Sequence, residues 1–516
     1  MKNSNNCPDI VFISPSNKKL GLFRSFVPRS IPLGIGILSG FLLQNGYQVA
    51  ILDEEIENIT NKKIKKIIKK MKKPRIFGIS SMTTNAGRAY QFAKIIKKLD
   101  KQAIVILGGI HPTVAPEEVL KVGNVDIVVQ GEGEKSILKI MNMLKAGKQD
   151  FWSIPNIAYL DSQKKIVFSG NSEEPFDINL LEMFPYYLFD QNHYDLGFIL
   201  ASRGCPFDCI FCSQRVITKR RYRSRDNNHV IAELKYLINQ KGQKNITFFD
   251  DFFTGDKKRV YLLCQMIREH GFEKKCSFGV QTRADSIDRE ILLEMKRSGF
   301  DSLMIGFEVS SNHLMKVINK GETVEDNINA IKLAKEIGFT TEATFIFGFP
   351  EETYAERINS LQIAKTVGVD RARFNNLAPY PGTKMYEIAK SQKRLHIEKN
   401  WENFSSAGAV TASIFKNYKV PYCSEGTNSK DLVGEVFFAN LLFYLNIKNL
   451  KKLFNVRKKG SGKWFEIPKD KLLNPIIYIK LILLFINVTL RLIYFLLFSK
   501  ECRRFFIDGF FKNKYI

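Results

Sequence analysis

Short apolar runs alternate with amphipathic stretches through the first part of the chain. The apolar runs are rich in isoleucine and valine, as buried strands are, and they lie at residues 9–14, 47–53, 75–80, 103–107 and 125–130. The stretches between them repeat apolar residues at helical spacing, at residues 33–45, 62–72, 87–99, 116–121 and 134–144. This order predicts a Rossmann-like α/β domain over residues 1–150, in which helices cover both faces of an open parallel sheet.

A second alternation of strands and helices follows between residues 196 and 393. We expect its strands at residues 198–201, 245–249, 277–281, 302–307, 341–347 and 371–377. Six βα units predict a partial (β/α)6 barrel of the TIM type, whose chemistry takes place at the carboxyl ends of the strands. Residues 151–195 are predicted to be a connector that contains a small hairpin at residues 157–168.

Residues 394–516 are predicted to form a helical region with an apolar tail at 475–498. Lys480 and Arg491 interrupt this tail, so its uncharged stretch at 481–490 is short for a bilayer core. Four polar residues return to one side of a helix, namely Lys480, Asn487, Arg491 and Tyr494. Basic residues flank them, namely Lys469, Lys471, Lys500, Arg503 and Arg504. The pattern predicts a helix in the interface of an anionic membrane, and a helix packed on the barrel is the alternative.

The formal charge of the chain is +26 and comes mostly from lysine. A basic surface can bind nucleic acid, anionic lipid or an acidic substrate. In the lysine-rich stretch 61–73, however, Ile64, Ile67, Ile68 and Met71 fall on one helical face, so the lysines cover the outer face of an amphipathic helix. We therefore interpret the charge as solvated surface and expect no nucleic-acid partner.

Eight cysteines are distributed unevenly, with three of them inside eight residues and the other five scattered. That usage is typical of a reducing compartment and one metal site, and it excludes a disulfide framework. The N-terminus has no long apolar run and is not a signal peptide. We expect a cytoplasmic protein that can lie at the inner face of the membrane through its tail.

Cys205, Cys209 and Cys212 have the spacing C-x-x-x-C-x-x-C, in the loop after a predicted strand. Three thiolates leave one iron of a 4Fe–4S cluster without a protein ligand, so a small molecule can chelate that iron. A structural zinc site requires four ligands, usually as two pairs. A purely electron-carrying cluster requires a fourth cysteine, and the nearest, Cys264, falls in a predicted helix. The cysteines therefore predict an open cluster.

The cysteine spacing, with Phe211 before the third cysteine, resembles that of the radical S-adenosylmethionine superfamily. The resemblance covers residues 196 to about 393. It implies that a 4Fe–4S cluster on the three cysteines cleaves S-adenosylmethionine reductively. It also implies that Asp251 holds the methionine amino group, although relatives carry Gly-Gly-Glu where this chain has Asp250-Asp251. Arg283 and Glu308 are placed like the groups that contact methionine carboxylate and ribose, and Gly348 begins the bend that passes the adenine.

Residues 1–150 resemble a cobalamin-binding domain. The matching stretches are Pro32-Leu33-Gly34 and the strand ends that carry Gly108, Gly109, His111 and Gly131. None has the G-x-G-x-x-G spacing of a dinucleotide fold, which argues against NAD. The D-x-H-x-x-G motif that supplies a cobalt ligand is absent, so cobalamin would bind without that lower ligand. His111 could approach the cofactor or bond within its own loop.

The tandem of the two domains resembles cobalamin-dependent radical enzymes of the methyltransferase and oxidative-cyclase type. It implies an electron donor such as flavodoxin or ferredoxin and a small-molecule substrate. We favour methylation of an unactivated carbon on a lipid-like or natural-product substrate, because the tail is apolar. Oxidative cyclisation of a tetrapyrrole is one alternative, and a cobalamin- or redox-sensing binding module is the other. Methylthiotransferases need three more cysteines in the first domain, which has only Cys7.

Overall fold

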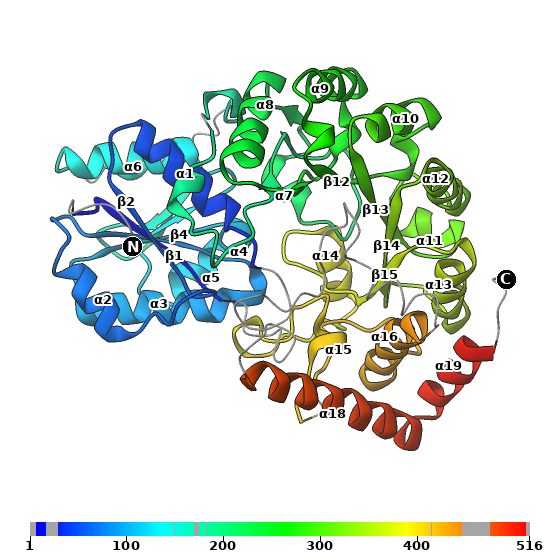
Figure 1. The fold of residues 1–516 in the computed structure, drawn as a ribbon. Helices are drawn as coiled ribbons and strands as arrows, with labels where there is room; N and C mark the ends of the chain where they lie inside the picture. The colour runs from blue at the N-terminus through cyan, green and yellow to red at the C-terminus, as the bar shows by residue number, and fades with distance from the viewer. Residues whose placement is uncertain are drawn as a thin grey trace.

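The computed structural model describes residues 7–16, 29–148, 150–169, 175–181, 183–413, 415–445 and 475–511. Two α/β bodies lie side by side, and C-terminal helices line one side of the second body (Figure 1). This is the α/β architecture that the two alternating patterns predicted.

Among the described residues, seven strands form the first sheet, in the order β2-β1-β3-β4-β5-β6-β7. Their bounds are Ile10–Ser14 (β1), Val49–Asp53 (β2), Ile76–Ser80 (β3), Ile104–Gly108 (β4), Ile127–Val129 (β5), Ile157–Leu160 (β6) and Ile166–Phe168 (β7). The first five strands pair in parallel. They are predominantly apolar because helices cover both of their faces.

The helices of this domain are Leu33–Gln44 (α1), Asn61–Ile68 (α2), Ala86–Leu99 (α3), Ile110–Val114 (α4), Pro116–Lys121 (α5) and Glu134–Lys145 (α6). Helices α1 and α6 cover one face of the sheet, and α2 and α3 cover the other (Figure 1). Ile64, Ile67 and Ile68 of α2 are buried in the core. The lysines of α2 therefore cover its outer face, as the spacing predicted.

The hairpin forms at the predicted residues 157–168, but it belongs to the first sheet. Strand β6 pairs antiparallel with β5, and β7 pairs antiparallel with β6, so the hairpin extends the first sheet rather than standing in a connector. A free sheet edge exposes unpaired backbone groups, and β6 satisfies those of β5. The first domain therefore reaches residue 168, and the predicted boundary at residue 150 is wrong.

In the described part of the second body, six parallel strands form a sheet in the order β15-β14-β13-β12-β11-β8. Their bounds are Phe198–Ile199 (β8), Asn245–Phe248 (β11), Ser277–Thr282 (β12), Phe300–Glu308 (β13), Thr340–Phe347 (β14) and Arg371–Asn376 (β15). A short antiparallel pair, Ser202–Arg203 (β9) and Arg223–Ser224 (β10), lies beside it. The sheet order leaves β8 and β15 as its two edges, which confirms the predicted partial (β/α)6 barrel.

Helices alternate with these strands and begin at defined caps. Their bounds are Gln214–Thr218 (α7), Asn227–Lys235 (α8), Lys257–Glu269 (α9), Arg289–Arg297 (α10), Asn312–Val317 (α11), Val324–Ile337 (α12), Tyr354–Val367 (α13) and Lys384–Ser391 (α14). Thr323 and Thr353 each start a capping box, and Asp256 and Asp288 accept backbone N–H groups at the starts of α9 and α10. Such caps satisfy donors that the first turn leaves free.

Helix α16 (Ser429–Tyr444) covers the edge strand β15. The Asn440 amide donates to the Phe374 carbonyl at 2.8 Å and accepts from the Phe374 N–H at 3.2 Å. The Tyr444 hydroxyl donates to the Ala372 carbonyl at 2.9 Å. Side chains of α16 therefore take the place of a neighbouring strand and protect this edge.

The segment after the barrel also completes the first domain. Trp401 and Phe404 are buried in the core beneath α2 and α3. The indole N–H of Trp401 donates to Glu118 Oε1 at 2.8 Å. A segment that follows the barrel in sequence therefore contributes to the core of the first domain.

The C-terminal region ends in Gly408–Thr411 (α15), α16, Pro475–Phe498 (α18) and Lys500–Phe511 (α19). By length and composition, residues 478–498 could cross a membrane. Tyr494 of the predicted polar stripe is 37% exposed, but Asn487 is buried and Arg491 is 3% exposed, so these two residues face the protein. The guanidinium of Arg491 donates to the carbonyls of Ala409, Val410 and Ala412, which explains the inward orientation. Lys469 and Lys471 lie outside the described residues.

Candidate functional site

The loop of the three cysteines lies at the carboxyl-terminal side of the barrel and is held from two directions. The Ile210 N–H donates to the Ile318 carbonyl at 3.0 Å, and the Met385 N–H donates to the Ile210 carbonyl at 2.9 Å. Asp208 forms ion pairs with Arg215 and Lys384 at 2.8 and 2.7 Å. These contacts attach the centre of the loop to the end of α11 and to α14.

Gly204 and Asp251 set the start of this loop. Gly204 has φ +86°, and a Cβ there would lie 2.1 Å from the Arg221 carbonyl oxygen, so the approach of the two segments requires glycine. Asp251 Oδ2 accepts from the Gly204 N–H at 3.0 Å and from Gln214 Nε2 at 2.5 Å. The buried neighbour Asp250 accepts from the Ala201 N–H and the Ser202 hydroxyl. The Asp250-Asp251 pair therefore braces both ends of the segment before Cys205.

Arg283, which follows β12, lies against the same loop. Its guanidinium stacks on the ring of Phe207, 3.4 Å from the ring centroid. It donates to both oxygens of Asp285 at 3.0 and 2.7 Å and to the Lys320 carbonyl at 2.8 Å. These contacts fix a buried positive charge beside the cysteines.

Glu308 ends β13 with φ +68°, a conformation that is uncommon for any residue but glycine. Burial raises the pKa of its carboxyl, and the ammonium of Lys320, 4.0 Å away, opposes that shift. Lys320 is itself buried and also pairs with Glu322 at 3.2 Å. Sequence reasoning missed Lys320. The signal was Asn319-Lys320-Gly321, a charged residue in a short turn between two helices.

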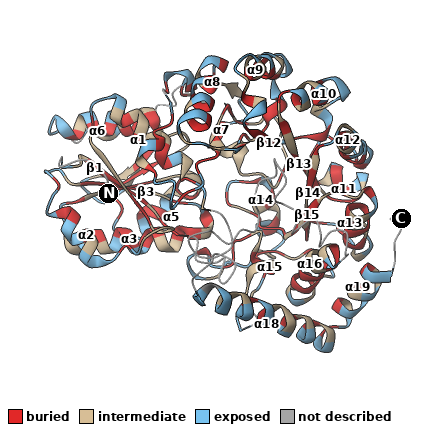
Figure 2. Ribbon diagram, viewed as in Figure 1, coloured by how far each residue is buried: buried red, intermediate tan, exposed pale blue. Residues whose placement is uncertain are grey.

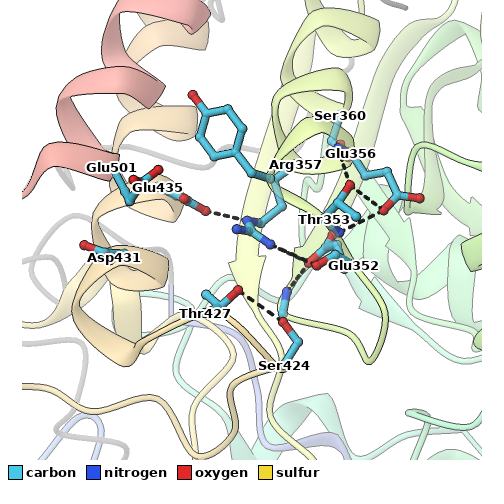
Figure 3. Close-up of polar contacts among 12 residues, drawn as sticks. Glu352, Thr353, Glu356, Arg357, Ser360, Ser424, Thr427, Asp431, Glu435 and Glu501 are labelled. Carbon is cyan, nitrogen blue, oxygen red and sulfur yellow. Dashed lines mark hydrogen bonds and ion pairs between the residues drawn. The ribbon is translucent and has the colours of Figure 1, made fainter.

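Gly348 begins the bend after β14 and has φ +105°. Its N–H donates to Glu352, and the following Phe349 packs edge-on against Phe211 of the cysteine loop, with centroids 5.4 Å apart. Figure 3 shows Glu352 beside Arg357, whose guanidinium also bonds Glu435 of α16. A cavity of about 640 Å³ lies here, and its walls come from α13, α16, α19 and the 422–427 loop.

The chemistry of the cysteines fits a charged inorganic cluster. Burial raises the pKa of all three thiols, to about 12 for Cys212, while Arg283 and Lys320 oppose the shift at Cys205 and Cys209. Thiols that ionise so reluctantly become thiolates when metal binds. Within the described ranges, no three His, Cys, Asp or Glu side chains converge on a point that would hold one metal ion. Three cysteines spread along a loop suit the corners of a larger iron–sulfur unit better than a single ion.

The strand ends of the first sheet face this loop. Gly109 has φ +101°, and a Cβ there would lie 2.7 Å from the Ser81 carbonyl oxygen. Gly131 has φ +68°, and its N–H donates to the Thr113 hydroxyl at 2.9 Å. A Cβ on Gly131 would point toward the Ile217 carbonyl of α7, at 3.8 Å. Gly108 ends β4, and the Ser81 N–H donates to its carbonyl at 2.8 Å.

His111 is fully buried and does not open toward a ligand. Its Nε2 bonds the Tyr90 hydroxyl at 2.7 Å, and the ring packs edge-on against Trp401, with centroids 5.4 Å apart. The Tyr90 hydroxyl also donates to Glu118 at 3.0 Å. The ring of His111 therefore bonds a residue of α3 rather than its own loop, and it takes part in joining the two bodies.

Two acidic residues after Gly131 bind the barrel directly. Glu134 accepts from Arg203 at 2.7 Å. Glu132 pairs with Arg203 at 3.3 Å and with Arg223 at 2.5 Å. Burial alone would raise the pKa of Glu132, but the two arginines together lower it below its usual value. The carboxyl therefore stays ionised. Since Arg203 immediately precedes Gly204, the ion pairs join the end of β5 to the start of the cysteine loop.

The comparisons with known proteins agree with this geometry. Residues 199–364 match the radical SAM superfamily, and residues 20–140 match the B12 binding domain. An uncharacterized methyltransferase of Pyrococcus horikoshii is 31% identical over 420 residues, which are 79% of this chain and 90% of that protein. The anaerobic magnesium-protoporphyrin IX monomethyl ester cyclase of Cereibacter sphaeroides is 26% identical over 376 residues, 70% of this chain and 60% of the cyclase.

A solved structure with a similar fold comes from the same class of enzyme. The structure of the cobalamin-dependent S-adenosylmethionine radical enzyme OxsB, with aqua-cobalamin and S-adenosylmethionine bound, superposes with a TM-score of 0.67 at 17% identity. The match covers 97% of this chain and 74% of that chain. The chain therefore belongs to the cobalamin-binding radical S-adenosylmethionine enzymes, which use a 4Fe–4S cluster, S-adenosylmethionine and cobalamin.

Proposed function

We propose that this enzyme methylates an unactivated carbon of a lipid-like or natural-product substrate. This proposal rests on the arrangement of the two domains: the cysteine loop of the barrel and the strand ends of the first sheet face each other, with α7 between them. Two cofactors held at these edges would both reach a substrate between the domains. The apolar surface of the C-terminal helices favours a lipid-like substrate.

In this proposal Cys205, Cys209 and Cys212 hold the cluster. S-adenosylmethionine is contacted by Asp251, Arg283, Glu308 and Gly348. Cobalamin would lie against the strand ends that carry Gly108, Gly109 and Gly131. His111 is not proposed as a ligand, because its Nε2 is bonded to Tyr90 inside the core.

When bound, the cluster and S-adenosylmethionine would supply a 5′-deoxyadenosyl radical, and cobalamin would supply the methyl group. The chain's own residues position and shield these groups. Arg283 and Lys320 place positive charge beside the thiols, which favours a negatively charged cluster. Phe211 of the cysteine loop packs edge-on against Phe349, which places an apolar contact beside the proposed cluster. An electron donor of the flavodoxin or ferredoxin type would complete the system, which we place in the cytoplasm.

Oxidative cyclisation is the second candidate, and the similarity to the Cereibacter sphaeroides cyclase favours it. The two reactions differ in their products. Methylation transfers a methyl group that comes from S-adenosylmethionine, so the product has one carbon more than the substrate. Oxidative cyclisation removes hydrogen from the substrate and adds no carbon. The mass of the product with methyl-labelled S-adenosylmethionine separates them.

The cluster assignment is tested with Cys209→Ala. We expect anaerobically reconstituted wild-type protein to bind about four irons and to release 5′-deoxyadenosine, and we expect the variant to lose cluster absorbance and cleavage. Cys7→Ala is the matched control, because Cys7 is exposed and far along the chain from the loop. Wild-type levels of cleavage by Cys209→Ala would refute the assignment.

A further inference from the structure

The outer side of the C-terminal helices is apolar and exposed. Its residues on α18 are Ile476, Ile479, Ile482, Leu483, Phe485, Ile486, Leu490, Ile493, Leu497 and Phe498, and on α19 they are Ile507, Phe510 and Phe511. Phe485, Leu497 and Phe498 are 73%, 64% and 65% exposed. Figure 2 shows these helices along the outer margin of the molecule. Exposed apolar residues gathered on two adjoining helices mark an interaction surface.

The buried side of α18 carries the polar residues Asn487 and Arg491 together with the apolar residues Leu484 and Phe495. Arg491 and Asn487 point inward, and the guanidinium of Arg491 lies over the ring of Phe437, 4.4 Å from its centroid. Burial lowers the pKa of Arg491 to about 10. Hydrogen bonds to the carbonyls of Ala409 and Val410 and the burial of Phe495 therefore attach this side of the helix, while the opposite, apolar side is exposed.

The attachment also determines how α18 can meet a membrane. The Ser499 hydroxyl donates to Asp431 at 2.6 Å, the Tyr354 hydroxyl donates to Asp508 at 2.9 Å, and Lys365 donates to the Gly509 carbonyl at 2.6 Å. A helix that crossed the bilayer would leave these partners and carry Arg491 into hydrocarbon, which is costly. With the contacts intact, α18 lies flat along the protein and presents one side outward.

We propose that the outer face of α18 and α19 docks on an anionic lipid bilayer and lies in its interfacial region. Exposed Lys500 and Arg503 stand where the two helices meet, in a chain of net charge +26, whereas Arg504 beside them pairs with Glu501 and Asp508. Basic groups beside an apolar helical face suit acidic headgroups. A second copy of the chain would bring equal charges together, which disfavours self-association through this face. Docking depends on the surface alone and goes beyond the proposed methylation.

Full-length protein is tested by co-sedimentation with vesicles of phosphatidylcholine, alone or mixed with phosphatidylglycerol. We expect binding to the mixed vesicles that weakens as salt is raised, because screening acts over about 10 Å at 0.1 M salt. The double variant Phe485→Glu with Leu497→Glu should bind at least about tenfold more weakly, since it places charge in the docking face. Deleting the tail is unsuitable, because Cys502 and Phe505 belong to the barrel core.

Leu262→Glu is the matched control. Leu262 is half-exposed on α9, which lies across the barrel from α18 (Figure 1), so this variant should bind as the wild type does. Cleavage of S-adenosylmethionine without lipid should be normal in both variants and reports folding independently of docking. Three results would overturn the proposal: no sedimentation of the wild type, a dimer that the double variant abolishes, or protein that only detergent releases from vesicles.

Discussion

Buried carboxyl groups at the rim of the barrel each have a defined partner, and Glu352 is the clearest example. It accepts the Gly348 N–H, lies 4.0 Å from Arg357 and shares that arginine with Glu435 (Figure 3). Burial raises its pKa from the usual 4.5 to about 8, although Arg357 and the Gly348 N–H oppose the shift. At neutral pH this carboxyl therefore keeps its proton in the folded protein.

A pH-dependent stability follows from that proton. Between pH 4.5 and 8 the folded chain holds it while the unfolded chain has lost it, so the free energy of unfolding falls as pH rises through this window. Glu352→Gln keeps an acceptor for Gly348 but has no proton to lose. We expect urea denaturation to show the variant gaining stability over the wild type as pH increases toward 8. Glu351 is exposed, so Glu351→Gln should show the same dependence of unfolding free energy on pH as the wild type. If the curve for Glu352→Gln ran parallel to that of the wild type, this account would be contradicted.

At the same scale, the sequence predicted some site residues far better than others. The cysteines are spaced within one loop, so their proximity needs no tertiary structure. Lys320 reaches Glu308 only because α11 returns its following turn to the end of β13, and no local pattern indicates that contact. His111 shows the opposite case. Its strand-end position was visible, but the Trp401 that encloses it is almost three hundred residues away.

At the scale of elements, periodicity shows which residues share a face of a helix, but it does not show which face is buried in the protein. The tail spacing correctly placed Asn487 and Arg491 on one side of a helix, yet that side is buried. Polar residues go inward when backbone groups there lack partners, and α15 offers the carbonyls of Ala409, Val410 and Ala412. The hairpin β6–β7 is similar: its strands were recognised, but its pairing with β5 depends on a sheet edge that no local pattern reveals.

The inward arginine gives a prediction for this element. Arg491→Leu would leave the α15 carbonyls without their donor, and we expect a loss of about 3 kcal/mol in the free energy of unfolding. Arg491→Lys should restore little, because an ammonium lacks the planar fork that reaches several carbonyls. Lys500→Met, also on the tail but exposed, should change stability by less than about 0.5 kcal/mol. Urea denaturation measures all three, and an Arg491→Leu variant as stable as the wild type would rule out this anchor.

At the scale of the whole molecule, both domain types and their order were predictable, because long alternating patterns specify parallel α/β folds. How the domains meet was not. Their junction includes Glu132 after β5, Glu134 at the start of α6, and Arg203 and Arg223 of the short strands β9 and β10, and these positions follow no shared periodicity. These pairs are largely buried, so losing one partner leaves a poorly compensated charge.

The junction is tested with Glu132→Gln. Arg203 keeps Glu134 as its partner, but Arg223 loses its paired carboxylate. We expect the free energy of unfolding to fall by about 2 kcal/mol or more. Adding salt to the wild-type protein should not cause the same loss, because the pair is largely buried. The matched control is Glu117→Gln, which breaks an exposed i,i+4 pair with Lys121 worth at most about 0.5 kcal/mol. Equal unfolding midpoints for the two variants would mean that the buried pairs do not stabilise the junction.

The burial of Trp401 and Phe404 in the first core has a consequence for how such enzymes diverge. A gene fragment that encoded only residues 1–168 would make a sheet with an open apolar patch where these two rings belong. Recombination that exchanged the front domain between relatives would therefore succeed only if the segment near residue 401 were inherited with it. The two halves of this protein are consequently expected to descend together, and matched changes at Glu118 and Trp401 should accumulate in pairs across lineages.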